Sequence, residues 1–162
     1  MNAPLHAAQF DIQGLAQAIS HCTASDALRC HFNQPHWDIL AAHLQAFSLN
    51  SGQVLMEQGT SDRTLHFIES GNLSVHYEDQ KSRVRMALVG AGTVLGEGSF
   101  FSHQPRSASV NASSSCRLWC LTPLRFTELA SRHAPIALEL TLALGSVMAR
   151  RLSLRPRRVA VT

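Results

Sequence analysis

The amino-acid sequence predicts an α+β fold, in which a small antiparallel barrel or jelly-roll lies between helices at both ends of the chain. Apolar side chains show helical spacing in the first 46 residues and again after Pro123. Between these regions, short apolar segments alternate with recurrent glycines. A chain of 162 residues can bury a core large enough for one domain, so we expect a single compact unit.

The N-terminal region is predicted to be helical as far as residue 46. From Ile12 to Cys22 the apolar residues recur at i, i+3, i+4 and i+7, which is typical of an amphipathic helix. Capping side chains at 23–26 would end this helix, and Pro35 suits the first turn of another helix that continues through His43. Residues 1–34 are therefore expected to form a helical extension.

The middle of the chain is predicted to be a meander of short strands. Glycines recur at positions 52, 59, 71, 90, 92 and 96, between segments with strand character. Apolar and polar residues alternate over 73–77, which predicts one buried and one wet face, with a turn at 70–72. Other expected strands span 54–57, 64–69 and 83–89, and a further hairpin pair spans 107–112 and 116–121. Many short strands with glycine turns favour a small barrel or jelly-roll.

The C-terminal region is predicted to contain a helix over 124–132 and a longer one from Pro135 to about Leu154. Pro156 disfavours helical structure at Arg155 and so sets the end. The long helix would measure about 30 Å. It has two apolar faces, and a monomer can cover only one of them against the strands. These faces comprise Leu140, Leu144 and Val147 on one side, and Leu138, Leu142, Gly145, Ala149 and Leu152 on the other.

The two apolar faces predict a homodimer through the long helix. The spacing of Leu140, Leu144, Val147, Arg151 and Leu154 alternates between four and three, as in a coiled-coil seam. Twofold pairing is the commonest way for identical chains to bury such a stripe. The alternative is a monomer in which the leading helix folds back over the exposed face.

Composition and charge exclude several classes of protein. Hydrophobic residues make up 45% and charged residues 15%, which is typical of a globular chain. Five arginines fall within 150–162, so the other residues sum to 3 − 5 = −2, and no basic face for nucleic acid is expected. The apolar stretch 134–149 is short for a bilayer and carries Glu139, which indicates a buried helix. Without a secretory signal pattern, we expect a cytoplasmic protein with free thiols.

The segment GEGSFFSHQPRSASV, residues 96–110, carries the most informative chemistry. It joins a glycine-rich loop to an expected one-turn helix that begins at Gly98 or Ser99 and ends at Ser102. The N-terminus of a helix presents unpaired amide groups to an anion, and Gly96 and Gly98 let the backbone approach it closely. The segment therefore predicts a phosphate cradle.

Charged residues within the same segment indicate what accompanies the phosphate. Arg106 follows Glu97 by nine residues, and its planar fork matches phosphate oxygens. Glu97 would repel phosphate, so we expect it to accept a hydrogen bond from a hydroxyl, while Ser107 can add a further donor. A sugar hydroxyl beside a phosphate is what a cyclic nucleotide presents.

On these residues the chain resembles the cyclic-nucleotide-binding-domain family, which is shared by bacterial catabolite-activator regulators, cyclic-nucleotide-dependent kinases and gated channels. The matching motifs are SGQVLMEQG (51–59), FIESGNLSVHY (67–77), the cassette at 96–108 and VMARRL (147–152). The resemblance covers about 35–155 and implies a β-roll over 47–122 with C-terminal helices over 123–155. Residues 156–162 are then a basic tail, which we expect to be disordered.

The resemblance also implies roles for individual residues. Glu97 would bind the ribose 2′-hydroxyl and Arg106 the cyclic phosphate, with Ser107 and the amides of Gly98 and Ser99 completing the site. The family usually has an apolar residue and then a small one after the Gly-Glu pair. Gly98 and Ser99 depart from this pattern, which could loosen the short helix. If the long helix caps the pocket, Arg155 would reach the base, where it could select guanine.

Taken together, these features predict a non-enzymatic receptor for cAMP, or less readily cGMP, which signals through its C-terminal helix to a protein partner. No catalytic set, cofactor or metal site is expected, and Cys22 and Cys30 do not match the spacing of iron–sulfur ligands. A cyclic dinucleotide remains open as the ligand. The alternatives are an interaction module that has lost the nucleotide, or the sensor half of a transcription regulator. Few residues follow Leu154, so no direct DNA binding is expected.

Overall fold

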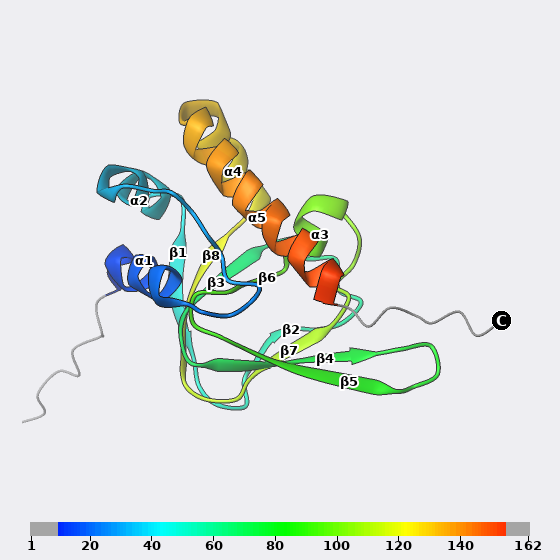
Figure 1. The fold of residues 1–162 in the computed structure, drawn as a ribbon. Coiled ribbons are helices and arrows are strands. Elements are labelled where there is room, and N and C mark those ends of the chain that lie inside the picture. Colours follow the sequence, from blue (N-terminus) through cyan, green and yellow to red (C-terminus); the bar gives the residue numbers. More distant parts are fainter. Residues whose placement is uncertain (1–9, 155–162) are drawn as a thin grey trace, which may run out of the picture.

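The computed structural model describes residues 10–154 and confirms the predicted α+β fold, an antiparallel β-roll flanked by helices (Figure 1). The N-terminal helices are α1 (Ile12–His21) and α2 (Gln34–Ala41). The roll comprises β1 (Gln45–Leu49), β2 (Val54–Met56), β3 (Leu65–Ser70), β4 (Asn72–Glu78), β5 (Val84–Gly90), β6 (Val94–Leu95), α3 (Glu97–Ser102), β7 (Ser109–Ala112) and β8 (Cys116–Leu121). The chain continues into α4 (Pro123–Arg132) and α5 (Ala134–Leu154).

The roll consists of two four-stranded sheets, with strand orders β1-β8-β3-β6 and β2-β7-β4-β5. The predicted hairpin of 107–112 with 116–121 is wrong, because β7 pairs with β2 and β4, and β8 pairs with β1 and β3. Val110 of β7 and Leu118 of β8 belong to the same buried cluster. The two strands therefore meet face to face across the core, where neither can donate ladder hydrogen bonds to the other.

Two further strand expectations need correction. Strands β1 and β6 were not predicted, since β1 begins inside the stretch expected to be helical and β6 has only two residues. The predicted alternation of β4 holds at Leu73, which is fully buried, but Tyr77 is 44% exposed. The hairpin β4–β5 extends away from the rest of the roll (Figure 1), so its far end has no second layer to cover it.

The N-terminal region is helical only in part. Residues 22–33, between α1 and α2, do not form a helix. Leu28 is 1% exposed, and its amide donates to the carbonyl of Gly92, which attaches this segment to the roll. Arg150 of α5 donates to the carbonyls of Ser25 and Ala27 at 2.8 and 2.7 Å. The segment is thus fastened both to the roll and to the end of α5.

The dimer seam predicted through Leu140, Leu144 and Val147 is wrong. These three side chains are fully buried in the core of their own chain, with side chains from α1, α2, α4 and the first sheet. Both faces of α5 carry apolar residues at alternating spacings of four and three, so the spacing alone could not distinguish them. The face left exposed comprises Leu138, Leu142, Gly145, Ala149 and Leu152.

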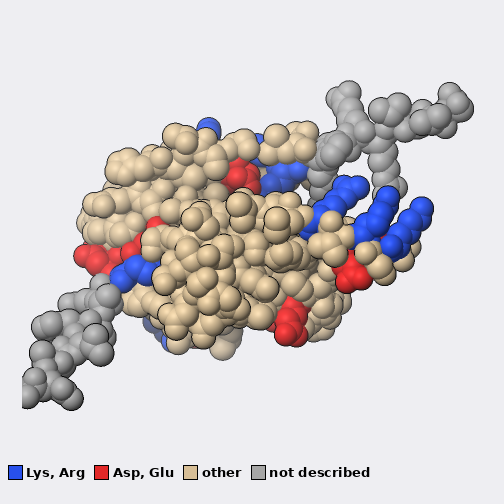
Figure 2. Space-filling view, turned by 90° about the horizontal axis from the view of Figure 1, so that it is seen from below, with Lys and Arg blue, Asp and Glu red and all other residues tan. Residues whose placement is uncertain are grey.

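The surface carries no large charged region on the face shown in Figure 2, where basic side chains lie mainly at one end. Among residues 10–154, no helix is long and apolar enough to cross a membrane. The four cysteines are free thiols. Burial, and secondarily the charge of Glu139, raises the pKa of Cys30 to about 12, so this thiol stays protonated at neutral pH.

Candidate functional site

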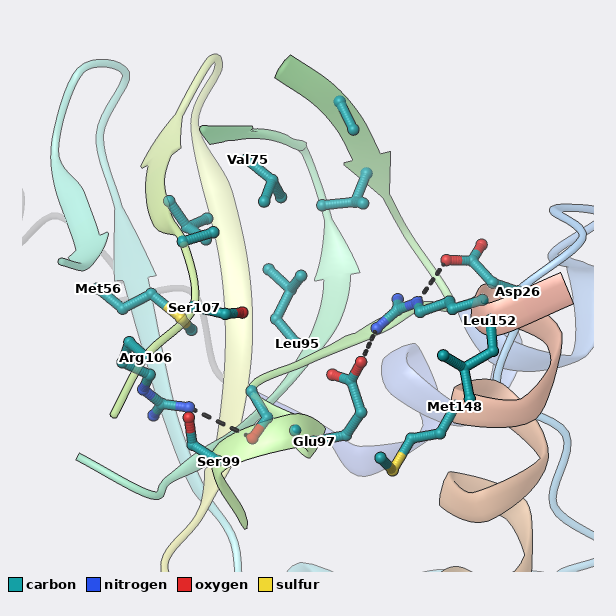
Figure 3. Close-up of a pocket in the computed structure, with 17 residues that line it drawn as sticks. Asp26, Met56, Val75, Leu95, Glu97, Ser99, Arg106, Ser107, Met148 and Leu152 are labelled. Carbon is teal, nitrogen blue, oxygen red and sulfur yellow. Dashed lines mark hydrogen bonds and ion pairs between the residues drawn. The ribbon is translucent and has the colours of Figure 1, made fainter. Parts of the chain in front are cut away.

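A cavity of about 410 Å³ opens beside α3, between the second sheet and the end of α5 (Figure 3). Six of the seven site residues predicted from the sequence line it: Gly96, Glu97, Gly98, Ser99, Arg106 and Ser107. The seventh, Arg155, lies outside the described residues. The apolar part of the lining comes from Met56, Val75, Ala87, Val89, Leu95, Ala108, Val110, Met148 and Leu152.

The short helix α3 begins at Glu97, one or two residues earlier than predicted. Gly96 caps it with φ at 88°, in the left-handed region that favours glycine. A Cβ on Gly98 would meet no atom within 4 Å, which leaves its backbone open to the cavity. The helix spans Glu97–Ser102 and Ser99 is buried in it, so the unusual Gly98-Ser99 pair does not prevent the helix from forming.

Arg106 is held rigidly at one end of the cavity. Its side chain is buried, and Nη2 donates to Asp62 Oδ2 at 2.5 Å and to the carbonyl of Thr64 at 2.7 Å. Nη1 donates to the carbonyl of Gly96 at 3.3 Å. Nε is buried without a hydrogen-bond partner in the described part of the chain. Buried donors are normally satisfied, so this N–H is an exception within the described residues.

Asp62 is a site residue that sequence reasoning missed. Burial alone would raise the pKa of its carboxyl, but hydrogen bonds from Arg106 and Thr64 outweigh this and hold the pKa below its ordinary value. Asp62 is therefore charged at neutral pH and orients the guanidinium. The sequence contains no spacing signal for this contact, because 44 residues separate the partners.

Glu97 forms an ion pair with Arg151, which was predicted from the sequence to lie in the dimer seam. Arg151 donates through Nη1 to Glu97 Oε1 at 2.6 Å. Its Nε donates to Asp26 Oδ2 and its Nη2 to the carbonyl of Val94, both at 2.8 Å. Burial would lower the pKa of Arg151, but the two carboxylates outweigh this and raise it. The VMARRL motif contains Arg151, yet only the folded chain reveals its partners.

The cavity has charged, polar and apolar parts. Arg106 supplies a basic group, Gly98 and Ser99 supply backbone amides, and Glu97 supplies a carboxylate. Apolar side chains such as Val75, Leu95 and Met148 form the walls (Figure 3). This combination suits a ligand with an anionic group, a hydroxyl and an apolar ring. Residues 10–154 contain no cluster of three or more His, Cys, Asp or Glu side chains that could hold a metal ion.

The fold and the cavity define a ligand-binding β-roll domain. Residues 46–133, more than half of the chain, match the family model described as the cyclic nucleotide-binding domain. The chain belongs to this family.

Known relatives agree with this assignment. The chain is 30% identical over 129 residues to the cAMP-activated global transcriptional regulator Vfr of Pseudomonas aeruginosa, with 76% of this chain and 58% of Vfr covered. It is 34% identical over 74 residues to the cAMP-dependent protein kinase type II regulatory subunit of Drosophila melanogaster, with 46% of this chain and 20% of that protein covered. The chain thus spans less than two thirds of the length of these relatives.

Solved structures show the same fold. A cyclic nucleotide-binding domain from Methylobacillus flagellatus superimposes with a TM-score of 0.78 at 20% identity, covering 88% of this chain and 78% of that one. The catabolite activator protein of Thermus thermophilus superimposes with a TM-score of 0.68 at 25% identity, covering 76% and 56%. Both comparisons therefore cover about three quarters of this chain or more.

Proposed function

We propose that this chain is a non-enzymatic cyclic-nucleotide receptor that prefers cAMP over cGMP. The observation that carries the proposal is the presence of Arg106 and Glu97 on one cavity with apolar walls. The cyclic phosphate would bind Arg106 with the amides of Gly98 and Ser99, and Ser107 would add a donor. The 2′-hydroxyl would bind Glu97, and the base would pack against the apolar walls.

The choice of cAMP rests on the relatives. Vfr and the regulators named CRP that match this chain are described as cAMP-activated. Contact of Arg155 with the base, which would favour guanine, belongs to the less favoured ligand cGMP and stays a prediction. We further propose a cytoplasmic location and a role without a cofactor, metal or chemical reaction.

Signalling through α5 is the second part of the proposal. Met148, Arg151 and Leu152 of this helix line the cavity, so a bound nucleotide would contact the helix directly. Ligand binding would then change how firmly the end of α5 is held, which a protein partner could sense.

We also propose that two copies pair through the exposed face of α5. Leu138 and Leu142 are 60% and 62% exposed, and Leu152 is 61% exposed. Together with Gly145 and Ala149 they follow the four-three spacing of a coiled-coil seam. A closed twofold contact would remove this apolar stripe from water.

Calorimetric titration with cAMP, cGMP and a cyclic dinucleotide tests the proposed ligand. We expect saturable binding of cAMP at lower concentration than of cGMP. In a thermal unfolding assay, cAMP at about 100 times its dissociation constant should add about 2.7 kcal/mol of stability, hence roughly 5 to 10 °C. Failure of all three ligands to bind would favour an interaction module that has lost the nucleotide. Preference for the dinucleotide would contradict cAMP as the ligand.

A further inference from the structure

The N-terminal segment contributes an acidic residue, Asp26, to the lining of the cavity. Asp26 lies outside residues 46–133, which match the family model. It sits in a turn closed by a hydrogen bond from the amide of Ala27 to the carbonyl of Ala24 at 3.1 Å. Arg150 donates to the carbonyls on either side of Asp26, those of Ser25 and Ala27. Hydrogen bonds on both sides of Asp26 therefore hold its backbone in place at the edge of the site.

Asp26 and Glu97 share one cation, Arg151. Arginine and a carboxylate frequently form two parallel hydrogen bonds, which occupy both carboxylate oxygens. Here Arg151 gives Nε to Asp26 and Nη2 to the carbonyl of Val94, so only Nη1 remains for Glu97. Within residues 10–154, the second oxygen of Glu97 accepts no hydrogen bond.

The three side chains are partly shielded from water. The side-chain exposures are 14% for Glu97, 23% for Arg151 and 21% for Asp26. In such surroundings a carboxylate oxygen gains more from a hydrogen-bond donor than it would at the surface. The second oxygen of Glu97 is thus a strong acceptor, provided that Arg151 does not close on it.

We infer that Asp26 is a specificity-determining residue that positions Arg151 and so keeps one oxygen of Glu97 available to a sugar hydroxyl. This inference rests on the proposed function. The ligands it distinguishes are cyclic ribonucleotides and cyclic deoxyribonucleotides, which differ in the 2′-hydroxyl that Glu97 would accept. Without Asp26, the guanidinium of Arg151 is free to turn and to present two adjacent N–H groups to Glu97, either those of Nη1 and Nη2 or those of Nε and Nη2. The ligand hydroxyl must then compete with this two-point pair.

The test compares cAMP with 2′-deoxy-cAMP by calorimetry, using the full chain and its Asp26→Ala variant. A hydrogen bond to a charged group contributes about 1.5 kcal/mol or more, so Asp26→Ala should weaken cAMP binding about tenfold or more. Binding of 2′-deoxy-cAMP should stay within about threefold of the wild type, because this ligand has no 2′-hydroxyl to lose. The ratio of the two dissociation constants would then fall about tenfold or more, so the variant would lose its preference for cAMP over 2′-deoxy-cAMP.

Two further variants control the experiment. Asp38→Ala removes an exposed aspartate of α2 that bonds to Gln34 and does not line the cavity, so both affinities should remain unchanged. Asp26→Glu retains the charge and should restore most of the ribose preference. Thermal unfolding checks that each variant folds, and Asp26→Leu, which has a similar shape but no acceptor, replaces Asp26→Ala if the latter does not.

The outcomes separate the inference from the proposed function. If the wild type binds cAMP but Asp26→Ala keeps the same ribose preference, the inference is wrong and the proposed function stands. Equal weakening of both ligands would mean that Asp26 only holds α5 in place, which also overturns the inference. If the wild type binds neither ligand, the proposed function fails and the inference fails with it.

Discussion

Arg106 fills the space that a side chain at residue 96 would occupy. A Cβ built on Gly96 would overlap Nη1 of Arg106 and the carbonyl oxygen of Thr64. The backbone of Gly96 also has φ at 88°, which side chains rarely adopt. The glycine at this position is thus needed both for its conformation and for the guanidinium beside it.

Gly96→Ala should therefore destabilise the fold and weaken ligand binding together. The left-handed backbone alone costs about 1 to 2 kcal/mol for a residue with a Cβ, and the overlap would displace Arg106. Chemical denaturation measures the first effect and calorimetry with cAMP the second. Gly98→Ala is the matched control, because its Cβ would meet no atom. It should change stability by no more than about +1 kcal/mol, and a loss as large as that of Gly96→Ala would contradict this account.

Arg106→Ala should abolish most of the binding energy that the site gives to an anion. Loss of one partner of a buried charged pair typically costs about 2 to 5 kcal/mol, so the dissociation constant for cAMP should rise roughly 30-fold to several thousandfold. Calorimetric titration measures this change. Arg125→Ala is the control, since the side chain of Arg125 is 56% exposed on α4 and pairs with Glu128 there. Binding by Arg106→Ala within about threefold of the wild type would refute the assignment.

His66 should make the fold less stable at acidic pH. Burial, followed by the charge of Arg106, lowers its pKa to about 4, and Asp62 opposes this only in part. Neither ring nitrogen forms a hydrogen bond in the described part of the chain. The unfolded chain takes up a proton near pH 6.5, whereas the folded chain does not until about pH 4. Stability is therefore complete above pH 6.5 and falls as the pH drops toward 4.

The variant His66→Phe should remove this contribution. Between pH 7.5 and 4.5 the wild type should lose about 2 to 3 kcal/mol more than the variant, measured by urea unfolding at each pH. The ring of Phe47 lies 5.9 Å from that of His66, so an aromatic replacement keeps a similar contact. The variant should also be at least as stable as the wild type near pH 7, because it leaves no buried nitrogen unpaired. Equal losses in both proteins would show that His66 is not the group responsible.

A glutamate introduced on the exposed face of α5 should have a different effect from one introduced on its buried face. Leu142 is 62% exposed on the proposed dimer face, so Leu142→Glu should yield a folded monomer in sedimentation experiments. Leu144 is fully buried in the core, so Leu144→Glu should unfold the chain rather than only separate dimers. Circular dichroism distinguishes the two results. A wild-type protein that remains a 17.7 kDa monomer at micromolar concentration would contradict the proposed dimer.

Local patterns were sufficient to predict much of the secondary structure, although not β1, β6 or the non-helical residues 22–33. Strand β8 was predicted at its observed bounds, and α5 within one residue of its start, because strand alternation and helical spacing are properties of neighbouring residues. The cassette from Gly96 to Ser107 was also predicted as one unit. Its glycines, carboxylate and arginine lie within twelve positions, and the structure places all of them on one cavity.

The sequence by itself determined the fold class and the chemical character of the cassette, since both depend on residues close together in the chain. Only the tertiary structure decided which residues support Glu97 and Arg106. Asp62 lies 44 residues from Arg106, and Arg151 lies 54 residues from Glu97. It also decided which face of α5 is buried, because both faces carry the same spacing. Contacts between distant segments depend on how the sheets and helices pack, and a single sequence contains no local signal for them.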